Sequence, residues 1–199
     1  MNLPQIKIIC KDITLDLTSY DALIFSSKNG VKAIENINRN WRKISSYAIG
    51  KPTAQKIKEL GGNLVYTSTS SYGNSFAQEL LPKLIGKKVL FLRAKKVLSS
   101  LEEILKKHGI DVNSQIVYET VCTKKRVLHV ENEKSVFIFT SPSTAECFFR
   151  NNDWCKNYIA VCIGEVTARV MPSDISLHVS KTQTIQACIE LAKTLIKQN

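Results

Sequence analysis

Short hydroxyl side chains stand just after apolar runs at matching places in the two halves of this 199-residue chain. The runs are expected to be parallel strands, whose carboxyl ends lie beside helix N-termini with unpaired backbone N–H groups. Such groups bind anions, and short side chains let a carboxylate or phosphate come close to them. The pattern therefore predicts an anion-binding site. Its members are Ser26, Ser27, Thr53, Ser141, Ser143 and Thr167.

The same hydroxyls have a second interpretation as helix caps. A serine that precedes a helix accepts a hydrogen bond from a backbone N–H group of the first turn. Ser27 and Ser143 fit this role as well as a binding role. The repeated Gly-x-x-Thr segments that hold Thr53 and Thr167 favour binding, and both interpretations stay open here.

Residues for other chemistries are missing. The chain has no Gly-x-Ser-x-Gly segment, no cysteine beside a histidine and no recognisable carboxylate pair. Neither glycine-rich phosphate-binding motif is present. The histidines His108, His129 and His178 lack the spacing of metal ligands. We therefore expect no metal ion and no organic cofactor.

The net charge of +11, from 28 basic and 17 acidic residues, indicates an anionic partner. Nucleic acid, an acidic membrane and a polyanionic small molecule all qualify, although a well-solvated surface gives the same surplus. No basic run reaches five residues and no nucleic-acid-binding motif occurs, so a nucleic acid is not expected. No 18-residue apolar stretch and no secretory signal are found, so a membrane is not expected either.

The six cysteines contain no C-x-x-C pair, and most lie in apolar surroundings. We expect reduced, buried thiols in a cytoplasmic protein rather than disulfides. The cysteines are Cys10, Cys122, Cys147, Cys155, Cys162 and Cys188.

Four apolar runs are predicted to be strands covered by helices on both faces. They span residues 22–25, 89–92, 136–139 and 159–163. Amphipathic segments predict a helix capped by Ser99-Ser100 and ended by Gly109, and a C-terminal helix over 184–196. Strands that alternate with helices predict an α/β fold with mostly parallel sheets.

The chain also repeats itself. A shift of 114 positions places Ile24-Phe25-Ser26-Ser27 on Ile138-Phe139-Thr140-Ser141. The same shift places Ile49-Gly50-x-x-Thr53-Ala54 on Ile163-Gly164-x-x-Thr167-Ala168. Two unrelated strands that look alike are the alternative. The repeat predicts an internal duplication.

Five segments, in this order and spacing, resemble the uroporphyrinogen-III synthase family of tetrapyrrole biosynthesis. The resemblance runs from about Leu3 to Leu195. Its segments are YDALIFSSKNGVKA (20–33), AIGKPTA (48–54), VYETV (117–121), FTSPSTA (139–145) and IGEVTA (163–168).

The resemblance implies two Rossmann- or flavodoxin-like parallel-sheet lobes joined by a two-stranded linker, with the active site in the cleft between the lobes. The first lobe would span 12–114 and the linker strands 1–11 and 115–122. The second lobe, 123–199, lacks the strand–helix unit with which family members usually begin.

The implied activity is that of a lyase of heme biosynthesis. Such an enzyme cyclises hydroxymethylbilane to uroporphyrinogen III, with loss of water and inversion of ring D, and needs no cofactor. The substrate carries eight carboxylates, which suits the positive charge. The resemblance further implies a cytoplasmic monomer that receives its substrate from hydroxymethylbilane synthase.

The resemblance also assigns roles to residues. Tyr118 matches the linker tyrosine of the family and would act as the acid, with a packing role as the alternative. The serines and threonines above would bind substrate. Leu98 stands where the family usually has an arginine, so Lys95 and Lys96 are expected to supply that charge.

A second class of function remains open. A non-catalytic two-lobed α/β protein that binds an acidic ligand or nucleic acid would carry the same charge and the same strand-end hydroxyls. The missing strand–helix unit and the missing arginine favour this alternative.

Overall fold

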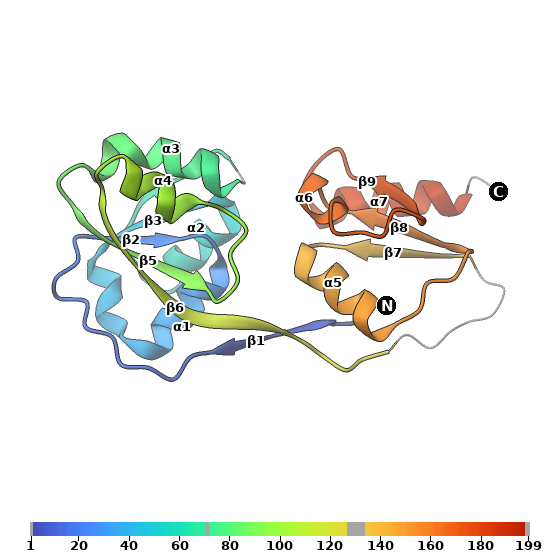
Figure 1. Cartoon of the computed structure of the whole chain (residues 1–199), viewed down its shortest axis with the longest axis horizontal. Helices are drawn as coiled ribbons and strands as arrows, with labels where there is room; N and C mark the ends of the chain where they lie inside the picture. Colours follow the sequence, from blue (N-terminus) through green and yellow to red (C-terminus); the bar gives the residue numbers. More distant parts are fainter. Residues whose placement is uncertain (1, 71, 127–133, 198–199) are drawn as a thin grey trace. The chain divides into compact units, whose positions relative to one another are not determined.

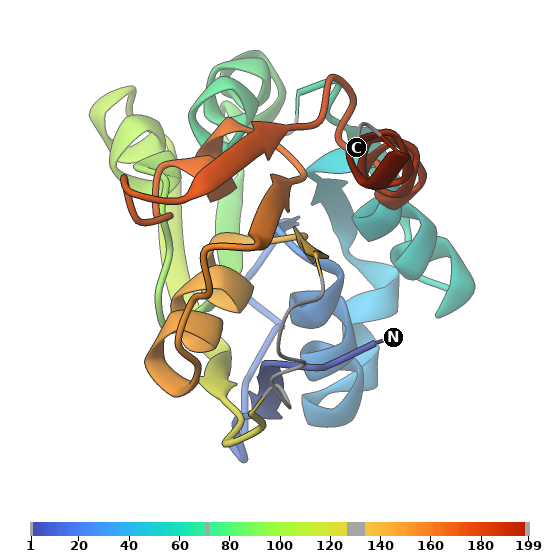
Figure 2. The same ribbon diagram turned by 90° about the vertical axis from the view of Figure 1, so that its right-hand side faces the viewer.

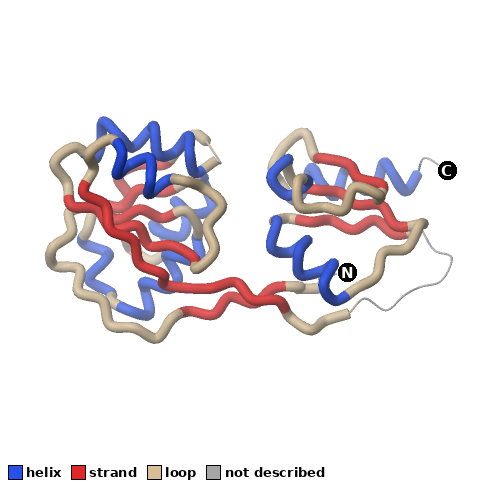
Figure 3. The backbone as a smooth tube through the Cα atoms, viewed as in Figure 1, coloured by secondary structure: helices blue, strands red, loops and turns tan. Residues whose placement is uncertain are grey.

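The chain folds into two compact units, and each is an α/β structure with helices and strands in layers (Figure 1, Figure 3). The computed structural model describes residues 2–70, 72–126 and 134–197. The large-sheet unit is Ile8–Thr120. The small-sheet unit is Met1–Lys7 with Val121–Asn199, so the chain passes from one unit to the other twice.

The large-sheet unit is built on a six-stranded sheet. Its strand order is β1 (Ile6–Cys10), β6 (Asp111–Cys122), β5 (Lys88–Ala94), β2 (Ala22–Phe25), β3 (Ser45–Ala48) and β4 (Leu64–Thr67). The pairs from β6 through to β4 are all parallel. The carboxyl ends of β5, β2 and β3 therefore meet at one edge, because Phe25 is level with both Leu92 and Ala48.

Alternation along β2 explains why this strand is apolar throughout. Leu23 and Phe25 enter a core beneath α1 (Lys28–Ile37) and α2 (Gly50–Glu59). Ala22 and Ile24 point to the other face, into a core beneath α3 (Gly73–Leu84) and α4 (Leu101–Lys107). Successive side chains of a strand face opposite sides, so a strand covered twice has no polar positions. A 3₁₀ helix, Arg39–Lys43, follows α1 and buries Trp41.

The small-sheet unit has three parallel strands in the order β7 (Ser135–Phe139), β8 (Tyr158–Cys162) and β9 (Ser176–Val179). One face packs on α5 (Pro142–Asn151) and α6 (Glu165–Ala168) through aromatic residues such as Phe139 and Phe148. The other face packs on α7 (Ile185–Lys197). Figure 2 shows α5 and α7 on opposite sides of this sheet.

The predicted α/β class with parallel sheets in two lobes is confirmed, and all four apolar runs are strands. The helix predicted after Ser100 is also present, as α4, but Ser100 makes no side-chain cap hydrogen bond. The two copies of the repeat share one element order, since β2-α1-β3-α2-β4 matches β7-α5-β8-α6-β9. The duplication itself, the linker and the exact lobe boundaries stay predictions.

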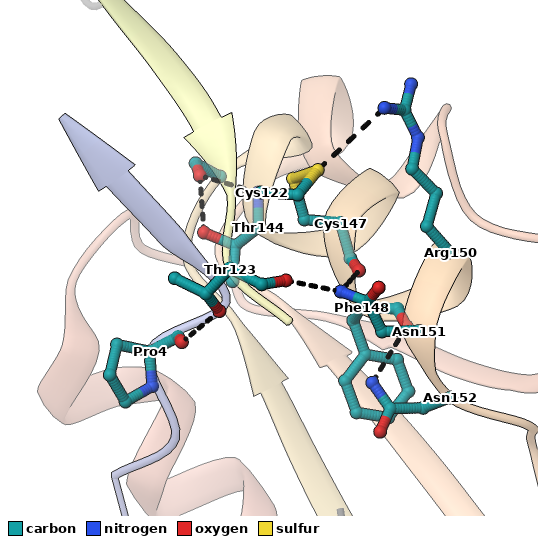
Figure 4. Close-up of a disulfide and its surroundings, with 10 residues drawn as sticks. Pro4, Cys122, Thr123, Thr144, Cys147, Phe148, Arg150, Asn151 and Asn152 are labelled. Carbon is teal, nitrogen blue, oxygen red and sulfur yellow. Dashed lines mark hydrogen bonds between the residues drawn. A yellow bond between two sulfur atoms is a disulfide. The ribbon is translucent and has the colours of Figure 1, made fainter. Parts of the chain in front are cut away.

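The prediction that all six cysteines are reduced is wrong for two of them. Cys122 at the end of β6 and Cys147 in α5 form a disulfide (Figure 4). Their Cα atoms lie 5.1 Å apart, within the range that a disulfide spans. Spacing in the sequence could not reveal this, because the two cysteines come from different elements. Cys10 is exposed, whereas Cys162 and Cys188 are buried free thiols as expected.

The residues labelled around the disulfide in Figure 4 all belong to the small-sheet unit. Asn151 Nδ2 donates hydrogen bonds to the Thr123 and Cys147 carbonyl oxygens at 2.7 and 3.0 Å. Thr123 Oγ1 donates to the Pro4 carbonyl oxygen at 2.9 Å. Polar contacts and the disulfide together therefore fix the end of the second crossing to α5.

Candidate functional site

Ser26 and Ser27 lie at the carboxyl edge of the large sheet, directly after β2, and both are half-buried. Ser27 is the N-cap of α1 and accepts a hydrogen bond from Asn29 N at 3.2 Å. The cap interpretation is thus confirmed for Ser27. A serine hydroxyl also has one hydrogen to donate, so capping does not use up its bonding capacity.

Tyr118 reaches the same edge from β6. A bulge shifts the register there, so that Ala94 pairs with Tyr118, and Lys95 N donates to the Tyr118 carbonyl oxygen at 2.9 Å. The side chain is 5% exposed and joins the core that holds Phe25. Burial raises the pKa of Tyr118, and a hydrogen bond with Ser27 opposes this rise. The phenol is therefore protonated at neutral pH, with Ser27 as the neighbour that most opposes the rise in its pKa.

Glu119, the next residue of β6, binds two lysines. Its carboxylate lies 3.1 Å from Lys11 Nζ and 3.4 Å from Lys95 Nζ. These contacts hold the pKa of Glu119 below its usual range, with Lys11 the larger cause. Lys95 remains 67% exposed and can exchange this partner for another carboxylate, and Lys96 is exposed beside it. Sequence reasoning missed Glu119.

The glycine turn before α2 also lies at this edge. Gly50 has φ 69°, a left-handed conformation that favours glycine, and Ile49 N donates to the Phe25 carbonyl oxygen at 3.0 Å. Thr53 lies in the helix that follows and is only 4% exposed. The structure thus brings Ser26, Ser27 and Lys95 to one edge with Tyr118, and buries Thr53 behind them.

The small sheet carries its predicted residues at the carboxyl ends of β7 and β8. Ser141 is the N-cap of α5 and accepts a hydrogen bond from Thr144 N at 3.2 Å. The cap interpretation of Ser143 is therefore wrong, since Ser143 lies inside the helix. Thr167 lies in α6 and is 3% exposed. The preceding Gly164 has an extended φ of −177°, so the two glycine turns differ in backbone conformation.

A serine- and threonine-rich loop after β4 adds hydroxyls that sequence reasoning missed. Glu79 of α3 anchors it by accepting hydrogen bonds from Tyr66 Oη at 2.9 Å and Thr69 Oγ1 at 3.3 Å. Burial raises the pKa of Glu79, but hydrogen bonds from Ser68, Tyr66 and Thr69 together lower it by more. The pKa is therefore below its usual value and the carboxylate is ionised. A run of hydroxyl residues directly after a strand was the available signal.

The described residues form neither a metal site nor a membrane-spanning helix. Across residues 2–70, 72–126 and 134–197, no three His, Cys, Asp or Glu side chains are placed to hold a metal ion. His129 lies outside these ranges. Within the same ranges, no helix has the length and apolar character needed to cross a membrane.

Comparison with known proteins gives consistent matches. The family model described as uroporphyrinogen-III synthase HemD matches residues 2–190. A Methanocaldococcus jannaschii protein, provisionally named uroporphyrinogen-III synthase, is 27% identical over 212 residues, which cover 96% of this chain and 87% of that protein.

Solved structures agree with the family model. The crystal structure of uroporphyrinogen-III synthetase from Helicobacter pylori is 31% identical, with a TM-score of 0.81 over 97% of this chain and 92% of that chain. A mutant uroporphyrinogen III synthase from Thermus thermophilus shares the fold at 14% identity, with a TM-score of 0.61 over 98% of this chain and 88% of that chain. The chain belongs to the uroporphyrinogen-III synthase family.

Proposed function

We propose that the protein is a hydro-lyase that cyclises hydroxymethylbilane to uroporphyrinogen III, with loss of water and inversion of ring D. One observation carries this proposal: Tyr118 and Ser27 lie at the same carboxyl edge of the large sheet, in a chain that matches the family over residues 2–190. The family match also supports this activity over the non-catalytic alternative.

Tyr118 is proposed to act as a hydrogen-bond donor to the leaving hydroxyl. Ser27 accepts from Asn29 N and is free to donate its own hydrogen to the Tyr118 oxygen. The phenolic hydrogen then remains available to the hydroxymethyl oxygen, which departs as water. A raised pKa keeps this hydrogen in place at neutral pH.

The strand-end groups of each unit are proposed to bind substrate carboxylates. In the large-sheet unit these are Ser26, Ser27, Thr53, Lys95 and Lys96. In the small-sheet unit they are Ser141, Ser143 and Thr167. Backbone N–H groups at helix starts and lysines suit carboxylates, and fixing a flexible chain can supply roughly 7–11 kcal/mol towards ring closure in favourable model systems.

The assay that tests this function makes hydroxymethylbilane in place with hydroxymethylbilane synthase. The products are oxidised to porphyrins and their isomers are separated. We expect isomer III to exceed isomer I, which forms spontaneously. Heat-treated protein is the control, and an unchanged isomer ratio would remove the enzymatic function.

Two finer properties belong to the same proposal. We expect a cytoplasmic monomer, which light scattering after gel filtration would check. We also expect the substrate to be passed on by hydroxymethylbilane synthase. Preformed hydroxymethylbilane should then give more isomer I than substrate made in place at the same flux, and equal ratios would argue for free diffusion.

A further inference from the structure

The segment that follows β5, residues 95–100, is held at both of its ends. At the first end, Arg93 Nη1 donates to the carbonyl oxygens of Ala94 and Lys95, at 3.1 and 3.4 Å. At the second end, Ser100 N donates to Asn74 Oδ1 of α3 at 2.9 Å. The 95–100 segment is therefore placed by named contacts on either side.

At the second end, the 95–100 segment lies close to α3 because residue 73 is a glycine. A Cβ atom built on Gly73 would lie 2.5 Å from Ser99 Cβ, a separation that real Cβ atoms do not show. Ser99 Cβ is fixed to the backbone, so a side chain at position 73 can be accommodated only if the 95–100 segment moves. Gly73 thus lets the start of α3 and this segment touch.

The 95–100 segment presents apolar side chains to water next to two positive charges. Val97 is 39% exposed and Leu98 is 66% exposed. Lys95 and Lys96 precede them and are exposed as well. An apolar surface beside cations suits a ligand that combines apolar ring faces with carboxylates, which is the chemistry of a linear tetrapyrrole.

The 95–100 segment lies next to Tyr118 and to the strand end that carries Ser26 and Ser27, and this position favours the proposed substrate as its ligand. Lys95 N donates a hydrogen bond to the Tyr118 carbonyl oxygen. Leu92 of β5 is level with Phe25, the last residue of β2, which Ser26 and Ser27 follow. Val97 and Leu98 therefore come two and three residues after the point where the chain touches the backbone of Tyr118.

We propose that Val97 and Leu98 form an apolar subsite that packs on the pyrrole rings of the substrate, and that Gly73 and Asn74 are positioning residues which hold this subsite in place. The inference rests on the proposed function and adds to it a set of contacts that recognise rings rather than carboxylates. A pyrrole ring that covers Val97 and Leu98 removes their apolar surface from water, and this removal favours binding.

The first test replaces Leu98→Ser and uses Ile85→Ser as its matched control. Ile85 is also apolar, is 75% exposed, and precedes β5 at the opposite edge of the sheet. Leu98→Ser should raise KM about tenfold and let more isomer I escape, because apolar contacts of this size discriminate by roughly that factor. Ile85→Ser should change neither quantity.

The second test separates positioning from general damage. Gly73→Ala should raise KM in the same way, because it displaces Ser99. Adding Ser99→Gly removes the opposing Cβ, so the double variant should return to the KM of Ser99→Gly alone. A Gly73→Ala defect that Ser99→Gly does not relieve would overturn the positioning role.

Binding of uroporphyrin I, followed by its fluorescence, keeps this inference distinct from the proposed function. Weaker binding by Leu98→Ser than by wild type and Ile85→Ser supports the subsite even if no isomer III is made. If wild type makes isomer III and Leu98→Ser matches it in KM, isomer ratio and binding, the subsite is refuted. A change only in gel-filtration volume for Leu98→Ser would assign the surface to a second copy instead.

Discussion

The hydroxyl of Tyr118 has two properties that suit it to donate a proton. It is buried, which keeps its proton, and it lies at the same sheet edge as Ser27, whose hydroxyl opposes the rise in its pKa. Ser27 precedes Tyr118 by 91 positions, so no local pattern could join them. Parallel strands that end at one edge bring the two together.

Replacement of Tyr118→Phe should mainly lower kcat. The ring stays in the core, so the free energy of unfolding should fall by only about 1 kcal/mol for the lost hydrogen bond. Loss of acid assistance is worth typically 10²–10⁴-fold, and we expect about 10²-fold or less because the pyrrole nitrogen also helps to expel the hydroxyl. Steady-state rates of isomer III formation would measure this.

Tyr47→Phe is the matched control for this change. Tyr47 is 3% exposed on β3 and packs in the other core of the large-sheet unit. Its variant should keep wild-type kcat. A Tyr118→Phe enzyme with the same kcat would assign Tyr118 to packing alone.

Glu35 predicts a pH dependence of stability. Its carboxylate, 12% exposed, accepts from Trp41 Nε1 at 3.0 Å and Arg42 Nε at 3.1 Å, and Arg39 lies 3.2 Å away. Burial raises the pKa of Glu35, but the hydrogen bonds from Arg42 and Trp41 together lower it by more, so that it lies below its usual 4.5. A carboxyl whose pKa is lower in the folded state stabilises that state above about pH 4.5, and this contribution is lost as the pH falls through the folded pKa.

Glu35→Gln should therefore lower the free energy of unfolding at pH 7 by about 1–2 kcal/mol. The effect is no larger because both arginines are exposed and water screens their charges. The difference from wild type should shrink as the pH is lowered from about 4.5. Urea unfolding between pH 3 and 7, followed by circular dichroism, would measure it. A difference that stays constant over this range would contradict the assignment.

At the scale of elements, apolar patterning predicted β2, β5, β7 and β8, but not the more polar β3, β4 and β9. Run 22–25 is apolar because both faces of β2 are covered, and this shows directly in the sequence. The N-cap of α5 was harder to predict. Ser141 and Ser143 both precede or begin the apolar helix pattern, and which of them is the cap depends on where the chain leaves the sheet.

Some parts of the site could not be predicted from the sequence. Glu119 with Lys11 and Lys95 depends on which strands are neighbours, and a single sequence does not encode that in any local motif. The conformations of Gly50 and Gly164 differ although their surrounding residues align. Contacts between distant segments decide both features.

The disulfide should stabilise the small-sheet unit. Cys122 and Cys147 are 25 positions apart, and closing a loop of that size contributes roughly 3 kcal/mol by restricting the unfolded chain. Reductant should therefore lower the Tm of the wild type by several degrees. Cys147→Ser should melt at that lower temperature with or without reductant.

Cys155→Ser is the control for the disulfide. Cys155 is a half-buried cysteine of the same unit and is not part of the disulfide, so its variant should keep the sensitivity to reductant. A wild-type Tm that does not change with reductant would show that the bond does not form in solution.

The whole molecule carries a net charge of +11, and its proposed substrate carries eight carboxylates. Attraction between them acts over about 10 Å at 0.1 M salt and is screened at higher salt. KM should rise several-fold between low and high ionic strength, while kcat changes little. Initial rates across a sodium chloride series would measure this.

The Lys95→Ala, Lys96→Ala double variant tests which charges matter. It should have a higher KM than either single variant and a weaker dependence on salt. Lys95→Ala alone should raise KM by less than the double variant does, because Glu119 already neutralises part of the Lys95 charge. An unchanged KM in the double variant would show that these lysines do not bind substrate.

The bond between Cys122 and Cys147 closes the intervening backbone into a covalent ring. Lys124, Lys125 and Arg126 lie on that ring and are exposed, so trypsin can open it there. One cut would add the mass of a water molecule and would release no fragment, since the sulfur atoms still join the two pieces. Only a thiol would separate them on a gel. For this chain, a single band without reductant is therefore no proof that the backbone is intact.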